Sequence, residues 1–217
     1  MGERLECPLE VDGLTRTAQT SDGRSCQYQG PEDERIDLTL MALNGHAPND
    51  ALTGLQQDLR KESGLEESGG ATANQVGAKD RDDQGSDHAR IDLPGLHLDA
   101  DNGKASVRLP GISVNANDDG AQINTGWGPY KNLQIEAQNG HAEIRGGDVS
   151  EAGAKLVYLI ASDQPGPGGY HTVGYEARGP ASGPLVVGVF KSRREQHDHH
   201  RLTSSGLDAL IRLNVKD

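Results

Sequence analysis

The sequence predicts a mainly β protein of the α+β class, in which two strands-then-helix halves flank an inserted β repeat. Three observations predict this fold. Turn signals of the Asx-Gly type recur between residues 91 and 145, apolar and polar residues alternate strictly between those turns, and each end of the chain carries strand patterns followed by a helical one. At 217 residues the chain is long enough to bury a sizeable core.

Closely similar turns divide residues 90–146 into short strands. The pairs Asn102-Gly103, Asp119-Gly120 and Asn139-Gly140 supply the positive φ that a two-residue hairpin turn needs. Two Leu-Pro-Gly triplets, at 93–95 and 109–111, add to the internal repeat. The segment fits either a short β-solenoid or an antiparallel meander, and the two-residue turns favour the meander.

Between these turns the side chains alternate with the period of a strand, so one face is expected to be buried and the other wet. The apolar positions are Leu96, Leu98, Ala100, Ala105, Val107, Leu109, Ile112, Val114, Ala116, Ala121, Ile123, Leu133, Ile135, Ala137, Ala142 and Ile144. The opposite face holds His97, Asp99, Ser106, Arg108, Ser113, Asn115, Gln122, Asn124, Gln134, Glu136, Glu143 and Arg145.

Residues 1–62 form the first half of the predicted α+β domain. The pattern predicts strands over 5–11, 14–19, 25–29 and 35–43. A helix follows, capped by Asn49 or Asp50, with Leu52, Leu55 and Leu59 on one stripe. Residues 63–89 are polar, glycine-rich and without period, which predicts a flexible linker.

Residues 147–217 form the second half. Strands are predicted over 155–161, 170–177 and 184–191, before a helix capped near Ser204 or Ser205. Its apolar positions are Leu207, Leu210, Ile211 and Val215. We expect the halves to form one antiparallel sheet with both helices on one face; chance likeness of two α+β stretches is the alternative.

The acidic composition excludes some partners. A formal net charge of -12 argues against nucleic acid, which requires clustered Lys and Arg. No run approaches the roughly 20 apolar residues of a membrane span, and no signal peptide is visible, as expected of a mature chain.

Cys7 and Cys26 are the two cysteines of the chain, and both lie beside strand signals. We expect a disulfide, which favours an oxidising compartment such as the periplasm or the extracellular space. The alternative is two unrelated buried cysteines.

Two sets of residues are candidates for binding. Trp127 and Tyr130 lie in a glycine-containing loop and could stack on a sugar or anchor a partner, although Trp127 could instead cap the repeat core. The cluster His197, Asp198, His199 and His200 offers ligands that suit zinc, nickel or copper, and a polar loop is its alternative reading.

No catalytic motif is present: the chain has no nucleophile elbow, P-loop, dinucleotide fingerprint or His-Glu-x-x-His pattern, so no catalytic residue is predicted. Glu136 and Glu143 could face each other across a hairpin, as the paired carboxylates of glycoside hydrolysis do. Acidic β proteins also offer such pairs by chance.

Two stretches resemble known groups of proteins. Residues Leu5 to Pro8 and Asp22 to Tyr28 resemble uncharacterised secreted or periplasmic proteins of Gram-negative bacteria, and the Asx-Gly repeat resembles the adhesin-like β repeats of bacterial envelope proteins. Neither likeness carries a catalytic residue. The leading hypothesis is a non-enzymatic envelope protein that binds or scaffolds a partner. The alternatives are a carbohydrate-binding or glycan-active protein using the acidic β face, and a metal-responsive protein using the histidine cluster.

Overall fold

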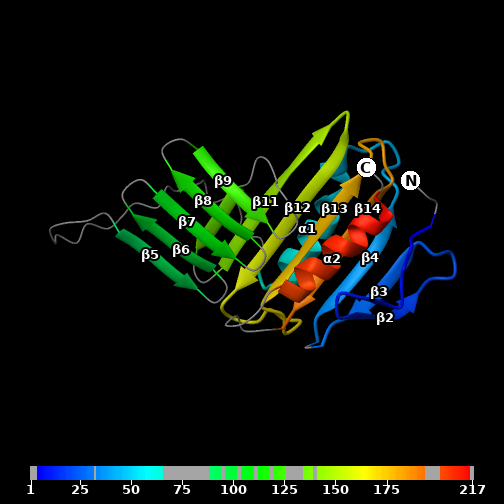
Figure 1. The fold of residues 1–217 in the computed structure, drawn as a ribbon, viewed down its shortest axis with the longest axis horizontal. Coiled ribbons are helices and arrows are strands. Elements are labelled where there is room, and N and C mark those ends of the chain that lie inside the picture. Colours follow the sequence, from blue (N-terminus) through cyan, green and yellow to red (C-terminus); the bar gives the residue numbers. More distant parts are fainter. Residues whose placement is uncertain are drawn as a thin grey trace.

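The computed structural model shows two antiparallel sheets and two helices (Figure 1). It describes residues 4–31, 33–65, 88–93, 96–101, 104–109, 112–117, 120–125, 134–138, 141–193 and 201–215, and between 88 and 125 it describes the backbone of the strands. The mainly β, α+β prediction is confirmed.

The larger sheet has nine strands, in the order β1-β2-β3-β4-β14-β13-β12-β11-β10. Every neighbouring pair in it is antiparallel. The strands are β1 (Glu10–Val11), β2 (Leu14–Gln19), β3 (Ser25–Gln29), β4 (Arg35–Met41), β10 (Gln134–Gln138), β11 (His141–Ser150), β12 (Gly153–Ser162), β13 (Thr172–Gly179) and β14 (Leu185–Ser192). Of the strand predicted over 5–11, only β1 forms, and residues 4–9 belong to no strand.

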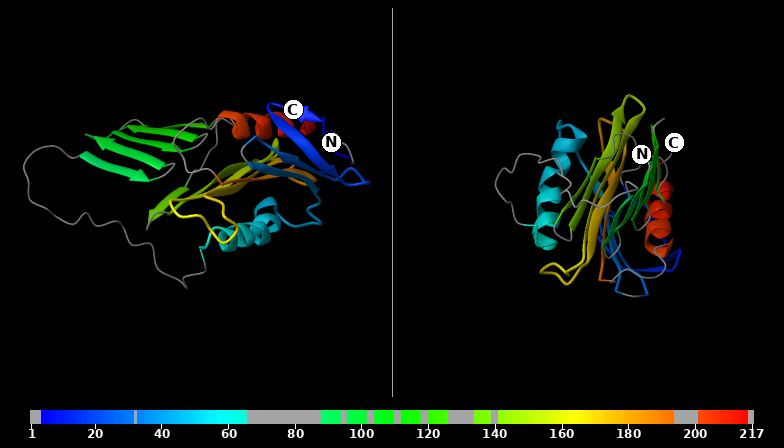
Figure 2. Two further views of the ribbon diagram at one scale, coloured as in Figure 1. Left: turned by 90° about the horizontal axis from the view of Figure 1, so that it is seen from below. Right: turned by 90° about the vertical axis from the view of Figure 1, so that its left-hand side faces the viewer.

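The two halves meet where β4 pairs with β14. Four strands, β1 to β4, precede the helix of the first half, and three strands, β12 to β14, precede the helix of the second. Helix α1 (Pro48–Glu62) follows β4, and α2 (Arg201–Asn214) follows β14. The helices lie on opposite faces of the sheet (Figure 2). The expectation that both cover one face is therefore wrong.

The central strands explain this arrangement. In β12, Leu156 and Tyr158 belong to the core under α1, whereas Val157 and Leu159 belong to the core under α2. A strand that is apolar on both faces must be covered on both. A two-fold axis normal to the sheet would place both helices on the same face. Because the helices lie on opposite faces, no such axis relates the two halves.

Both helices begin before the predicted caps. Pro48 occupies the first turn of α1 after Ala47, so Asn49 and Asp50 lie inside the helix. Proline suits this position because its fixed φ is already helical and it has no N–H to satisfy. Helix α2 begins at Arg201, which places Ser204 and Ser205 within it.

The smaller sheet is a five-stranded meander in sequence order, which confirms the meander over the solenoid. It consists of β5 (His88–Leu93), β6 (Leu96–Asp101), β7 (Lys104–Leu109), β8 (Ile112–Asn117) and β9 (Gly120–Thr125). In Figure 2 it lies on the side of the nine-stranded sheet that carries α2.

The strand ends place two residues in each connection of the meander. Asp101 pairs with Lys104, leaving 102–103, and Asn117 pairs with Gly120, leaving 118–119. The connection between β8 and β9 is thus offset by one residue from the predicted Asp119-Gly120 turn, because Gly120 belongs to β9.

The predicted β repeat is divided between the two sheets. Strands β5 to β9 form the meander, whereas β10 and β11 extend the nine-stranded sheet beyond β12. Most of the predicted linker, 66–87, lies outside the described residues.

Candidate functional site

The residues singled out for binding from the sequence are not among those the structure describes. Trp127 and Tyr130 fall in the 126–133 gap, and His197, Asp198, His199 and His200 fall in the 194–200 gap. Among the described residues, no three His, Cys, Asp or Glu side chains lie close enough to hold a metal ion. The predicted aromatic and metal sites stay predictions.

Glu143 is the centre of a polar cluster between α1 and the sheet. Its Oε2 accepts a hydrogen bond from Arg60 of α1 at 2.5 Å, and its Oε1 accepts from Arg145 at 2.5 Å and 3.0 Å. The buried Tyr158 hydroxyl also donates to Oε1. The Glu143 side chain is only 9% exposed, so this carboxylate is almost entirely surrounded by protein.

The partners of Glu143 determine its ionisation. Burial opposes the charged form, but the hydrogen bonds from Tyr158, Arg145 and Arg60 outweigh it, and the pKa of Glu143 is lowered. Burial and the neighbouring carboxylate raise the pKa of Tyr158. Glu143 is thus an ionised hydrogen-bond acceptor and Tyr158 a neutral donor.

This arrangement opposes the use of Glu143 as a general acid. Glu136 does stand opposite Glu143 in the β10–β11 hairpin, as the sequence suggested. A general acid needs a raised pKa to hold its proton near neutral pH, and that of Glu143 is lowered. The contacts of Glu143 are those of a structural link between α1 and β11.

The same face holds a second buried phenol. Tyr175 stacks against Tyr158 with 5.7 Å between ring centroids, and its hydroxyl accepts a hydrogen bond from Gln56 of α1 at 2.7 Å. Burial raises the pKa of Tyr175 to about 12. The polar groups under α1 therefore join helix to sheet.

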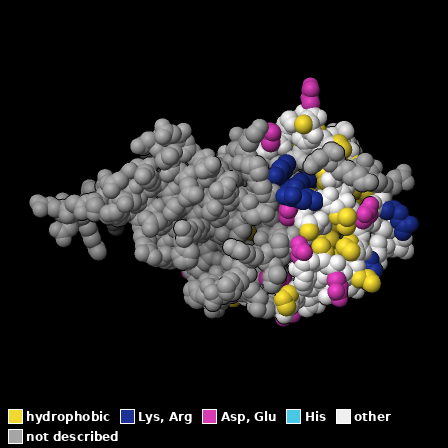
Figure 3. Space-filling model, in the orientation of Figure 1, with side chains coloured by type: hydrophobic (Ala, Val, Ile, Leu, Met, Phe, Trp, Pro, Cys, Tyr) yellow, Lys and Arg dark blue, Asp and Glu magenta, His cyan; other side chains and the backbone are white. Residues whose placement is uncertain are grey.

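A matching cluster lies under α2. Glu176 is fully buried and accepts a hydrogen bond from Arg178 at 2.5 Å, while Arg178 reaches Asp208 of α2 at 2.9 Å. Arg212, one turn later in α2, pairs with the other oxygen of Asp208 at 2.7 Å. Figure 3, drawn from the α2 side, shows side chains of both charges over the described part of this face.

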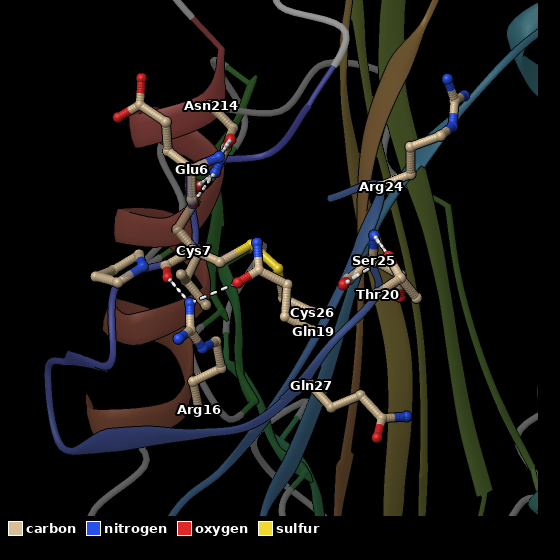
Figure 4. Close-up of a disulfide and its surroundings, with 12 residues drawn as sticks. Glu6, Cys7, Arg16, Gln19, Thr20, Arg24, Ser25, Cys26, Gln27 and Asn214 are labelled. Carbon is tan, nitrogen blue, oxygen red and sulfur yellow. Dashed lines mark hydrogen bonds between the residues drawn. A yellow bond between two sulfur atoms is a disulfide. The ribbon is translucent and has the colours of Figure 1, made fainter. Parts of the chain in front are cut away.

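The disulfide joins the N-terminal segment to β3, as predicted from the cysteine count (Figure 4). Cys26 is fully buried in the core under α2. Next to Cys7, the backbone N–H of Glu6 donates to Asn214 at 2.7 Å, and Asn214 donates back to the Glu6 carbonyl at 3.0 Å. The disulfide thus holds in place the segment that contacts the end of α2.

The meander presents a different kind of surface, defined by its strand register. One row across the sheet consists of Ile91, Leu98, Val107, Val114 and Ile123, and a second consists of Ala89, Ala100, Ala105, Ala116 and Ala121. The intervening rows consist of Asp92, His97, Arg108, Ser113 and Asn124, and of Arg90, Asp99, Ser106, Asn115 and Gln122. Because alternate residues of a strand belong to opposite faces, the register gives the meander one apolar and one polar face. We call the second pair of rows the polar meander face.

Sequence reasoning found the polar meander face but missed both charged clusters. Arg60 and Glu143 are 83 residues apart, and Arg178 and Asp208 are 30 apart. Their pairing depends on which face each helix covers. The one available signal was the pair of charged residues, Glu176 and Arg178, within the otherwise uncharged strand β13, because a buried carboxylate requires a cationic partner.

The comparisons with known proteins found no relative. No family model matches the chain, and no curated protein and no solved structure proved similar to it.

Proposed function

We propose that this protein is a non-enzymatic binding or scaffolding protein of the bacterial cell envelope, whose polar meander face meets a partner protein. The observation that carries this proposal is the register of β5 to β9, which aligns the polar positions of five strands into continuous rows. A regular, extended sheet face offers many hydrogen-bonding groups to a partner with little loss of conformational entropy.

The disulfide and the ion pairs of two buried carboxylates further support it. The disulfide is compatible with a periplasmic or extracellular location, because such bonds persist in oxidising compartments. No helix in the described part of the chain is long and apolar enough to cross a membrane. The carboxylates Glu143 and Glu176 are engaged in ion pairs that join helices to the sheet, which favours a structural role for them.

A glycan ligand is the second candidate, and the composition of β8 and β9 favours it. The polar rows there contain only amide and hydroxyl residues: Ser113, Asn115, Gln122 and Asn124. Amides and hydroxyls pair with neutral sugar hydroxyls by hydrogen bonding alone.

Affinity capture from a solubilised envelope fraction of the native host tests the proposal. The bait is the wild-type chain, compared with Asn115→Arg on the polar meander face and Trp127→Ala in the predicted aromatic loop. Gln57→Arg, on the exposed side of α1, is the matched control.

We expect one envelope protein that the wild type and Gln57→Arg retain and Asn115→Arg loses. Loss with Trp127→Ala as well would add the aromatic loop to the surface. Recovery of a glycan in place of a protein would favour the second candidate function, glycan binding. Equal capture by all four chains, or turnover of a chromogenic glycoside panel by the wild type, would contradict the proposal.

A further inference from the structure

We propose that two copies of this chain associate through β5, edge to edge, to form one continuous ten-stranded meander. The proposal rests on the register of β5 and does not depend on the proposed function.

Strand β5 is an edge of the meander, since it pairs with β6 alone among the described strands. In Figure 1 it is the outer strand, on the side of the meander away from the nine-stranded sheet. An edge strand presents backbone N–H and C=O groups that can pair with a further strand.

The hairpin register shows which backbone groups of β5 face outward. Leu93 and Leu96 flank a two-residue connection, and such a flanking pair is hydrogen-bonded. Hydrogen-bonded pairs alternate along an antiparallel ladder, so Ile91 bonds to β6 while Arg90 and Asp92 direct their N–H and C=O groups away from it. The outward groups are thus spaced symmetrically about Ile91.

A second copy, related by a two-fold axis through Ile91, can form backbone hydrogen bonds with the outward N–H and C=O groups of Arg90 and Asp92. Antiparallel pairing about this centre places Arg90 opposite the partner's Asp92, and Asp92 opposite the partner's Arg90. Opposite charges that face each other across strands stabilise a pair, whereas like charges destabilise it. Such a contact is isologous, so it closes as a dimer.

Other centres of symmetry within this strand are less favourable. A two-fold axis through Arg90 or through Asp92 sets like charges directly opposite each other. Only a two-fold axis through Ile91 sets each charged residue opposite one of the other sign. The same axis places Ile91 opposite the partner's Ile91, so the apolar row from Ile123 to Ile91 extends into the second copy.

The other edges lack this self-complementarity. Strand β1 has two residues, β9 has no charged residue, and two-fold pairing of β10 about its middle residue sets Glu136 against the partner's Glu136. We therefore assign the self-association to β5.

Complementary charge variants of the full chain, measured by sedimentation velocity over a concentration series, test this assignment. Arg90→Asp makes both edge residues acidic, and Asp92→Arg makes both basic. Each variant alone should lose self-association, with the dimer dissociation constant raised roughly tenfold or more. Mixed in equal amounts, the two should form a heterodimer of near wild-type affinity, because each acidic position then meets a basic one.

The mixture also controls for misfolding, because two unfolded variants do not restore each other's edge. Gln122→Asp, at the opposite edge of the meander, is the matched control and should dimerise like the wild type. A wild-type chain that stays monomeric throughout would overturn the proposal. So would single variants that dimerise normally, or folded single variants that stay monomeric when mixed.

Discussion

Glu143 illustrates how one residue joins distant parts of the chain. Its carboxylate accepts hydrogen bonds from α1, from β11 and from β12, and it is nearly excluded from solvent. A buried carboxylate is tolerated only when its charge is paired and its oxygens accept hydrogen bonds. The contacts between α1 and the sheet should therefore depend more on the Glu143 side chain than on the exposed residues around it.

Replacing Glu143 by Gln should lower the free energy of unfolding by about 2 kcal/mol, because it removes the negative charge and replaces one of the two accepting oxygens by an NH2 group, which cannot accept a hydrogen bond from an arginine. Urea denaturation measures the loss. Glu136→Gln is the matched control, since Glu136 faces Glu143 in the hairpin but is exposed, and it should leave the stability unchanged. Equal effects of the two substitutions would contradict the role assigned to Glu143.

The lowered pKa of Glu143 also predicts a pH dependence. Since the folded pKa lies below the ordinary value of 4.5, the unfolded state takes up the proton first as the pH falls. The stability contributed by ionised Glu143 is fully present above 4.5 and is lost as the pH falls through the folded value. The stability difference between wild type and Glu143→Gln should shrink over that acidic range. A difference that stays constant with pH would show that the charge is not responsible.

At the scale of elements, close packing of α2 on the sheet requires glycine at particular positions. A Cβ added to Gly188 of β14 would lie 2.2 Å from a methyl group of Leu207, and one added to Gly206 would lie 2.4 Å from Leu14. Both leucines are almost fully buried. The helix therefore lies too close to the sheet for a larger residue.

Gly188→Ala should accordingly destabilise the protein by about 1–3 kcal/mol through overpacking. Gly54→Ala is the opposite case, because a Cβ at this position in α1 meets nothing within 4 Å. There the removal of a flexible residue from a helix interior should raise stability by about 1 kcal/mol. Thermal unfolding of the two variants separates the effects, and a neutral Gly188→Ala would show that α2 can shift at no cost.

The sequence predicted most of the helices and strands, but it did not predict which face of the sheet each helix covers. Alternation defined the strands well, since positions such as Ile36, Leu38 and Leu40 face one core together. The prediction of the helix faces was wrong because the similarity of the two halves implies a common face, whereas the uninterrupted apolar run of β12 requires cover on both faces. That run, which indicates burial on both faces, could have placed a helix on each side.

For the candidate surfaces, what could be predicted depended on whether the residues involved are close together in the sequence. Strict alternation and turn spacing define the polar meander face, so local patterns were enough to predict it. The pairing of Arg60 with Glu143 depends on how α1 crosses the sheet, and no local pattern contains that information. The caps were wrong for a different reason, because a local signal was present: Pro48 starts α1 before the polar residues that resemble caps.

For the whole molecule, the disulfide stabilises the fold by restricting the unfolded chain. Cys7 and Cys26 are separated by 19 residues, and a loop of this length corresponds to about 3 kcal/mol in the chain-entropy model. The Cys7→Ser, Cys26→Ser double variant should lose about that much stability. Reductant should weaken the wild type and leave the double variant unaffected; equal stability of the oxidised wild type and the variant would contradict this account.

For the whole molecule, we propose an envelope protein that presents a regular polar sheet to a partner. Two features support this proposal together: the disulfide and the aligned rows of the meander. Its central claim concerns where contact occurs, and site-specific crosslinking in the native host addresses that contact directly.

The measurement places a photoreactive residue at position 115 of the polar meander face, or at position 57 on α1 as control, and irradiates intact cells. We expect a discrete adduct with an envelope component from position 115 and none from position 57. Adducts with cytoplasmic proteins, no adduct from position 115, or the same adducts from both positions would contradict it.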